Sequence, residues 1–228
     1  MRYIGLVAVA IIALLGAAVY MSLGTYNQTS IETTTTSQVT TTTTTTTTAT
    51  STSLSQEEID AILFMREEEK LARDVYLTLY DMWGLQIFSN IADSEQKHMD
   101  SVLTLINNYG LEDPAVDEIG VFTNPEIQEL YNQLIERGSQ SLEEALLVGA
   151  LIEEKDIIDI NNYLEITNNS DIITVFENLK TGSIHHLKAF TSTYESMTGE
   201  TYQPQLLSVE EYQQLIQTSG PGRGPAYP

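Results

Sequence analysis

The sequence of 228 residues contains no cysteine and only three histidines. Without cysteine, neither a disulfide framework nor a thiolate metal site can form. Any metal ion must therefore be held by Asp, Glu and His side chains, and the histidines available are His98, His185 and His186.

Basic residues are scarce as well, with 10 Lys and Arg against 32 Asp and Glu and a formal net charge of -22. A nucleic-acid-binding face needs clustered Lys and Arg, so this balance argues against nucleic acid as a partner. The acidic surplus fits a solvated, self-repelling surface as well as cation binding. The sequence also lacks the motifs of a nucleophile elbow, a phosphate-binding loop and a dinucleotide site.

A long apolar run without charge occupies the N-terminus, where residues 3–23 follow Met1 and Arg2. A helix of this length spans about 30 Å, the thickness of a bilayer core, and the charge of Arg2 favours a cytoplasmic N-terminus. We expect residues 1–24 to be a transmembrane anchor, with a cleaved signal segment as the alternative. The domain would then lie outside the cytoplasm, either on a single-pass protein of the cell membrane or secreted.

Residues 25–53 are rich in Thr and Ser, and residues 40–48 are all Thr. Such a segment cannot bury enough apolar surface to offset its chain entropy, so it predicts a disordered stalk, of a composition that is often O-glycosylated. N-glycosylation sequons at Asn27 and Asn168 agree with export. Residues 219–228, rich in Gly and Pro, predict a flexible tail, which leaves 54–218 for the folded domain.

Helix-capping signals divide residues 54–218 into helices. Capping boxes begin at Ser55 and Ser141, and Gly84 and Gly110 are typical helix ends. Together with apolar periodicity they predict four long helices at about 56–82, 85–109, 141–167 and 170–197, a short helix at 125–138 and a packed segment within 202–216. Gly182 weakens the last long helix, so a kink or a break there is the alternative to a continuous helix. The fold class is therefore all-α, a four-helix bundle with a long crossover between its second and third helices.

Acidic and histidine side chains lie on the inward stripes of these helices. Glu95 and His98, three residues apart, share one face of the second helix, and Glu69 and Tyr76 share a stripe of the first. A carboxylate from one helix and a Glu-x-x-His pair from its neighbour form half of a carboxylate-bridged dimetal site in a four-helix bundle. The alternative for the Glu95 and His98 pair is a surface contact.

Glu153 and Asp156 occupy the core line of the third long helix, and His186 that of the fourth. Glu67 and Glu68 are expected to face solvent, although the apolar neighbours of Glu68 make it a rival of Glu69.

The run 69–77, Glu-Lys-Leu-Ala-Arg-Asp-Val-Tyr-Leu, resembles the first helix of ferritin-like proteins, in which a ligand Glu precedes a Tyr by seven residues. Residues 95–98 are similar to the ligand pair of their second helix. The phrases at 67–76, 95–99, 149–154 and 186–190 together resemble an uncharacterised ferritin-like family, domain-of-unknown-function family 2202, over residues 54–215.

The resemblance implies a ferritin-like bundle that holds two metal ions, taken to be iron, with manganese or zinc as alternatives. It implies Glu69 and His98 on the first metal, Glu95 bridging, Glu153 bridging or terminal, and His186 on the second metal.

The sequence departs from the family pattern in the fourth helix. A second Glu-x-x-His pair would require Glu at position 183, where the chain has Ser183. We expect Asp156, on the same helix face as Glu153, to supply the missing carboxylate; otherwise the second metal position is weak and the site is mononuclear or vestigial. Tyr76 is the candidate catalytic residue, hydrogen-bonded to a ligand carboxylate, with a plain core tyrosine as the alternative. His185 is expected on the surface.

Two functions follow from these patterns. The first is a di-iron oxidoreductase of the peroxidase or ferroxidase type, acting on dioxygen, peroxide or ferrous ion. The second is a non-enzymatic bundle displayed on a glycosylated stalk for binding a partner or an envelope component. A membrane anchor and a stalk disfavour assembly into a closed storage cage. The sequence is compatible with a homodimer. Convergence of the candidate ligands distinguishes the two functions, because metal–ligand distances are about 2 Å.

Overall fold

The computed structural model describes residues 54–218. The predicted anchor at 1–24, stalk at 25–53 and tail at 219–228 lie outside the described residues. Within 54–218 all regular structure is helical, as predicted, and none of these helices has the length and hydropathy of a membrane span.

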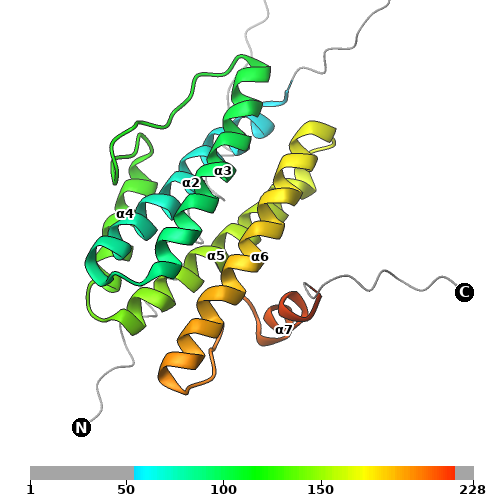
Figure 1. The fold of residues 1–228 in the computed structure, drawn as a ribbon. Coiled ribbons are helices and arrows are strands. Elements are labelled where there is room, and N and C mark those ends of the chain that lie inside the picture. The colour runs from blue at the N-terminus through cyan, green and yellow to red at the C-terminus, as the bar shows by residue number, and fades with distance from the viewer. Residues whose placement is uncertain (1–53, 219–228) are drawn as a thin grey trace, which may run out of the picture. The chain divides into compact units, whose positions relative to one another are not determined.

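The predicted long and short helices are present, with ends close to those expected from the capping signals (Figure 1). Ser55 forms the predicted capping box with Glu58, and Gly84 ends the first helix in the left-handed conformation with φ 66°. The helix that contains Gly182 is continuous, so the kink or break left open there does not occur. The bounds are α2 Gln56–Trp83, α3 Gln86–Tyr109, α4 Pro125–Gly138, α5 Leu142–Ile166, α6 Ser170–Thr198 and α7 Val209–Thr218.

The four long helices α2, α3, α5 and α6 lie side by side and run down, up, up and down in the view of Figure 1. The end of α5 lies beside the start of α2, where Thr167 donates to Glu58 over 2.6 Å. The end of α3 lies beside the start of α6, where Tyr109 donates to Asn169 over 3.1 Å. Therefore α3 and α5 are parallel, and the chain between them is the predicted long crossover, which carries α4.

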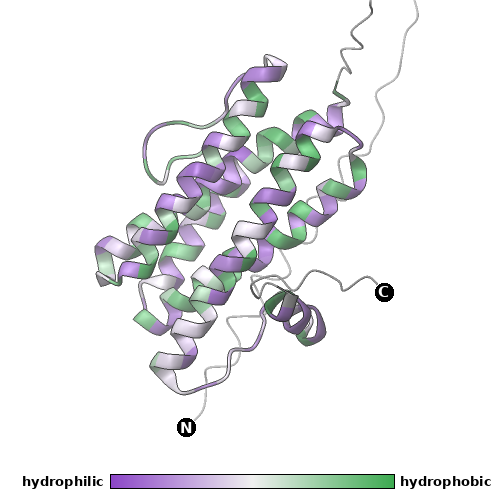
Figure 2. Ribbon diagram, turned by 45° about the vertical axis from the view of Figure 1, so that its right-hand side comes forward, coloured by the Kyte–Doolittle hydropathy of each residue, from purple (hydrophilic) through white to green (hydrophobic). Residues whose placement is uncertain are grey.

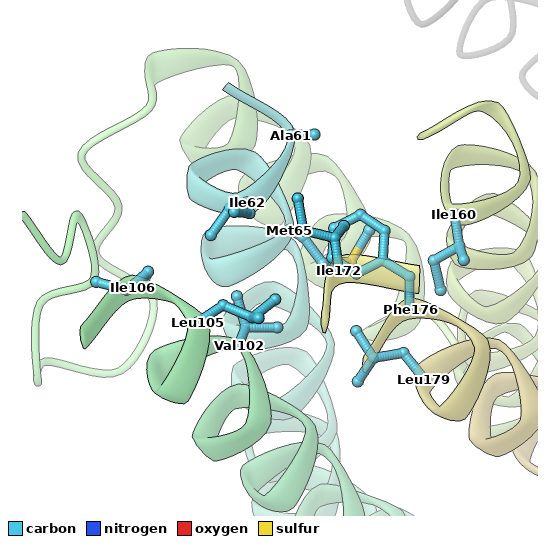
Figure 3. Packing of buried hydrophobic residues seen from close by; sticks show 10 residues of the cluster. All are labelled: Ala61, Ile62, Met65, Val102, Leu105, Ile106, Ile160, Ile172, Phe176 and Leu179. Atoms are coloured by element: carbon cyan, nitrogen blue, oxygen red, sulfur yellow. The ribbon is translucent and has the colours of Figure 1, made fainter. Parts of the chain in front are cut away.

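Apolar residues from all four long helices form a core near the start of α2 (Figure 3). Hydrophobic and hydrophilic positions alternate along each helix, as expected where one stripe faces inward (Figure 2). The cluster consists of Ala61, Ile62, Met65, Val102, Leu105, Ile106, Ile160, Ile172, Phe176 and Leu179.

The predicted solvent exposure of Glu67 and Glu68 is wrong, because both side chains are buried. Glu67 accepts hydrogen bonds from the backbone N–H groups of Thr123 and Asn124 in the crossover. Glu68 pairs with Lys155 of α5 at 2.6 Å. A buried carboxylate is tolerated where it is hydrogen-bonded or paired, and both partners here come from segments distant in sequence.

Two more charged residues of α2 fix the crossover to the bundle. Lys70, fully buried, donates to the backbone carbonyls of Glu118 and Val121 and pairs with Asp74. Asp74 in turn accepts from the backbone N–H of Gly120 at 2.9 Å. The buried charged residues described above lie on several sides of α2, and each of them has a hydrogen-bond or ion-pair partner.

Candidate metal centre

Glu95 and His98, one turn apart on α3, meet Glu69 of α2 in the interior of the bundle. Nδ1 of His98 lies 2.8 Å from Oε2 of Glu95 and 3.1 Å from Oε2 of Glu69. Both carboxylate side chains are fully buried, while 12% of the His98 side chain is exposed. These residues form one group whose ligand atoms all lie within 4.8 Å of one another.

A second group joins the same Glu95 to α5 and α6. Nδ1 of His186 lies 2.7 Å from Oε1 of Glu95 and 3.6 Å from Oε2 of Glu153, and the ligand atoms again lie within 4.8 Å of one another. Glu95 therefore belongs to both groups and faces one imidazole with each of its oxygens. The rings of His98 and His186 stack with centroids 5.4 Å apart.

Buried polar atoms without a hydrogen-bond partner are concentrated here. Among residues 54–218, every buried side-chain nitrogen or oxygen atom that lacks a hydrogen-bond partner belongs to one of six residues in or near the two groups. The approach of His186 Nδ1 to Glu95 Oε1 is close, yet it does not have hydrogen-bond geometry. Such unsatisfied atoms are costly unless a cation binds them, so the donor set fits a metal ion. The residues are Glu68, Glu69, Glu95, Glu153, Asp156 and His186.

The electrostatics of the site also favour positive charge. Burial would lower the pKa of His98, but the nearby carboxylates of Glu69 and Glu95 outweigh it and raise that pKa to about 11. Burial would likewise lower the pKa of His186, and Glu153 and Glu95 raise it to about 10. Carboxylates that hold protons on two imidazoles this strongly also attract divalent cations in their place, and the exchange releases protons.

Two hydroxyl groups contact the candidate ligands from outside. Tyr76 donates to Oε1 of Glu153 at 2.6 Å and also lies 3.3 Å from the carbonyl of Gly149, so its hydroxyl contacts a candidate ligand. The hydroxyl of Ser94 lies 2.9 Å from Nε2 of His186. Sequence reasoning missed Ser94, because its partner is distant in the chain and no local pattern connects the two residues.

Asp156 is buried, and both of its carboxylate oxygens lack a partner, but it belongs to neither converging group. Burial, followed by the charges of Glu68 and Glu69, raises its pKa well above the usual value. Ser183 is buried and donates to the carbonyl of Leu179, so no carboxylate stands at that position. His185 is exposed, as expected.

Position 182 requires glycine because the ring of His98 occupies the space that a Cβ atom would need. A Cβ atom at position 182 would lie 2.4 Å from Nε2 of His98, which no real side chain allows. The residue that weakens α6 as a helix former therefore makes room for a candidate ligand from the neighbouring α3. Gly149 serves the core in the same way, since its Cβ would lie 2.6 Å from the ring of Phe190.

Comparison with known proteins finds relatives over the same residues. The model of a family described as an uncharacterised protein domain, DUF2202, matches residues 58–219. The uncharacterised protein MJ0754 of Methanocaldococcus jannaschii is 51% identical over 167 residues, which covers 73% of this chain and 90% of that protein. The crystal structure of the hypothetical protein MJ0754 from Methanococcus jannaschii superimposes with a TM-score of 0.71 at 51% identity, covering 73% of this chain and 95% of that one.

Proposed function

The chain belongs to the uncharacterised DUF2202 family, and we propose that its helical bundle binds two metal ions side by side. The first position is formed by Glu69, Glu95 and His98, and the second by Glu95, Glu153 and His186. The observation that carries this proposal is the shared Glu95, which presents one oxygen to each group. Two three-ligand groups that share a carboxylate support a dimetal centre better than two separate sites.

The arrangement supports assignment to the ferritin-like superfamily. In that architecture four helices with one long crossover each contribute inward-pointing carboxylate or histidine ligands. Here α2, α3, α5 and α6 each contribute to the groups, and the crossover joins α3 to α5. The departure is Ser183, which leaves the fourth helix with a histidine alone.

Charge balance supports two ions and gives Asp156 a role. Buried charges are costly unless opposite charges lie beside them, so the ligands of a buried site tend to balance the charge of its ions. The carboxylates of Glu69, Glu95, Glu153 and Asp156 together carry the charge that neutralises two divalent cations with neutral imidazoles. We propose that Asp156 belongs to the centre as its fourth carboxylate, although it lies outside the converging groups.

Carboxylate and imidazole ligands suit iron and manganese and also accept zinc, and we propose two iron ions. Bound iron would supply one-electron redox chemistry toward dioxygen or peroxide. The proposed activity is therefore an oxidoreductase that acts on dioxygen, peroxide or ferrous ion.

The residues of the chain determine how a small oxidant reaches the centre. The side chains of Glu69, Glu95 and Glu153 are fully buried, whereas those of His98 and His186 are 12% and 10% exposed. The imidazoles are therefore the ligands nearest to solvent, and the oxidant is expected to approach between α3 and α6. Tyr76 is fully buried, and its hydrogen bond to Glu153 fixes the orientation of that carboxylate.

Metal analysis of the purified protein tests this proposal directly. We expect about two iron or manganese ions per chain, and we expect them to be lost in the double variant Glu95→Ala/His98→Ala with the helical circular dichroism retained. A protein that is folded but binds no iron, manganese or zinc would refute the proposal. It would leave the alternative, a non-enzymatic bundle for binding a partner or an envelope component.

We also propose that the domain is held outside the cytoplasm by a single N-terminal membrane segment. The apolar residues 3–23 and the Thr-rich residues 25–53 support this location. Protease added to intact cells is expected to release the domain, and its recovery in the cytosol after lysis would contradict the proposal.

A further inference from the structure

We infer that the two metal positions fill in a fixed order. The position formed by Glu95, Glu153 and His186, called here the Glu153 position, binds the first ion. The position formed by Glu69, Glu95 and His98, called the Glu69 position, binds the second ion. This inference rests on the proposed function, because it concerns the same pair of ions.

The carboxylate of the Glu153 position is held in place before any ion arrives. Tyr76 donates to Oε1 of Glu153 and leaves Oε2 free on the side of His186, 3.6 Å from its Nδ1. The Tyr76 ring is fully buried and packs against Phe190 and Phe88, with centroids 5.1 Å and 6.4 Å away. The donor therefore cannot rotate away, and Glu153 loses little conformational freedom on binding.

The histidine of the Glu153 position is held in the same way. Nδ1 of His186 faces Glu95 and Glu153, while Nε2 lies 2.9 Å from the hydroxyl of Ser94. With an ion on Nδ1, Nε2 carries the proton and donates it to Ser94, which sets both the tautomer and the ring orientation. Ser94 directly precedes Glu95, so one turn of α3 provides the bridging carboxylate and positions the histidine of α6.

The Glu69 position lacks such supports. Within residues 54–218, the carboxylate of Glu69 has His98 as its one hydrogen-bond partner. No described residue hydrogen-bonds to Nε2 of His98, and the ring rests against Gly182, which has no side chain. An ion entering here must replace the contact between its own two ligands. Once one ion is bound, its charge lowers the affinity of the remaining position, which separates the two binding steps.

Manganese(II) titration of the chelator-treated full chain, followed by electron paramagnetic resonance, tests the order. The first equivalent should give the spectrum of an isolated ion, and the second should replace it with that of a coupled pair. Glu69→Ala should retain the tight first step, whereas Glu153→Ala should lose it and retain only weak binding. Both carboxylates lack a full set of partners, so neither variant is expected to unfold.

The outcomes separate the two proposals. A folded wild-type chain that binds neither manganese nor iron or zinc refutes the proposed function and with it the order. Two bound ions with one common affinity refute the order alone, and so does loss of the tight step in Glu69→Ala instead of Glu153→Ala.

Ser94 provides a second, independent test as a positioning residue. Ser94→Ala should weaken the first step by about 10- to 100-fold, the usual effect of removing a partner of a ligating histidine. Ser94→Thr, which keeps the hydroxyl, should restore it. Ser101→Ala, an exposed serine on the same helix, is the matched control and should bind as the wild type does. Unchanged affinity in Ser94→Ala would remove Ser94 from the argument.

Discussion

Substituting Gly182 by alanine should empty one metal position without harming the fold. The added Cβ would lie 2.4 Å from Nε2 of His98, and ordinary contact begins near 3.4 Å. The imidazole must therefore retreat by about 1 Å. Metal ligands need to lie within about 0.2 Å of their ideal distance, so a displacement of this size removes His98 from effective coordination.

The same substitution has little effect on stability. Alanine is favoured over glycine in a helix interior by about 0.8–1.0 kcal/mol, and this gain offsets the cost of moving a partly exposed ring. We expect a free energy of unfolding within about 1 kcal/mol of the wild type, or a change in Tm of no more than about 2–4 °C.

Metal stoichiometry and thermal unfolding, measured on the same sample, check this prediction. The Gly182→Ala variant should hold about one ion per chain against about two in the wild type, with its circular dichroism unchanged. Thr181→Ala changes the adjacent exposed residue and should bind as the wild type does. A Gly182→Ala protein that binds two ions with native affinity would show that the position of His98 does not matter, and the reasoning would fail.

Three further predictions follow from the same contacts. Gly149→Ala places a Cβ 2.6 Å from the Phe190 ring, so thermal unfolding should show a loss of about 1–3 kcal/mol from overpacking; an unchanged Tm would mean that the core adapts freely. Tyr76→Phe removes the hydrogen bond to Glu153 and should weaken the tighter manganese step by about 10-fold or more, whereas wild-type binding would show that Tyr76 is only a core residue. The raised pKa values of the two imidazoles, about 11 and about 10, keep both protonated at neutral pH without metal; adding metal should therefore release protons in a pH-stat, and affinity should fall as pH falls, so binding independent of pH would contradict the ligand assignment.

Local signals predicted most of the fold. Ser55 and Gly84 mark the start and end of α2 because capping depends on residues within one turn of each other. The spacing of Glu95 and His98 placed both on one face, and the structure brings them to the same point in the interior. Metal binding there stays a prediction.

The features that sequence reasoning missed all depend on partners far away in the chain. Glu67 looks like a surface residue until the crossover folds back and presents two backbone N–H groups to it. Ser94 has no visible role until α6 brings His186 beside it. Gly182 looked like a weak point of its helix, and its reason is a ring on α3. Apolar periodicity is a property of one helix, so it does not predict which residues of two different helices will be in contact.

The order of the helices also has a consequence for folding. The pairs α2–α3 and α5–α6 are each joined by a short turn and close locally, which is fast, whereas docking one hairpin onto the other must wait for the long crossover. The Glu153 position takes Glu95 from the first hairpin and its other ligands from the second. An ion bound there, as proposed, would stabilise the docked state and neither hairpin alone. Metal would then stabilise the product of the last folding step. Chelation should raise the rate at which the two hairpins separate, before either hairpin unfolds.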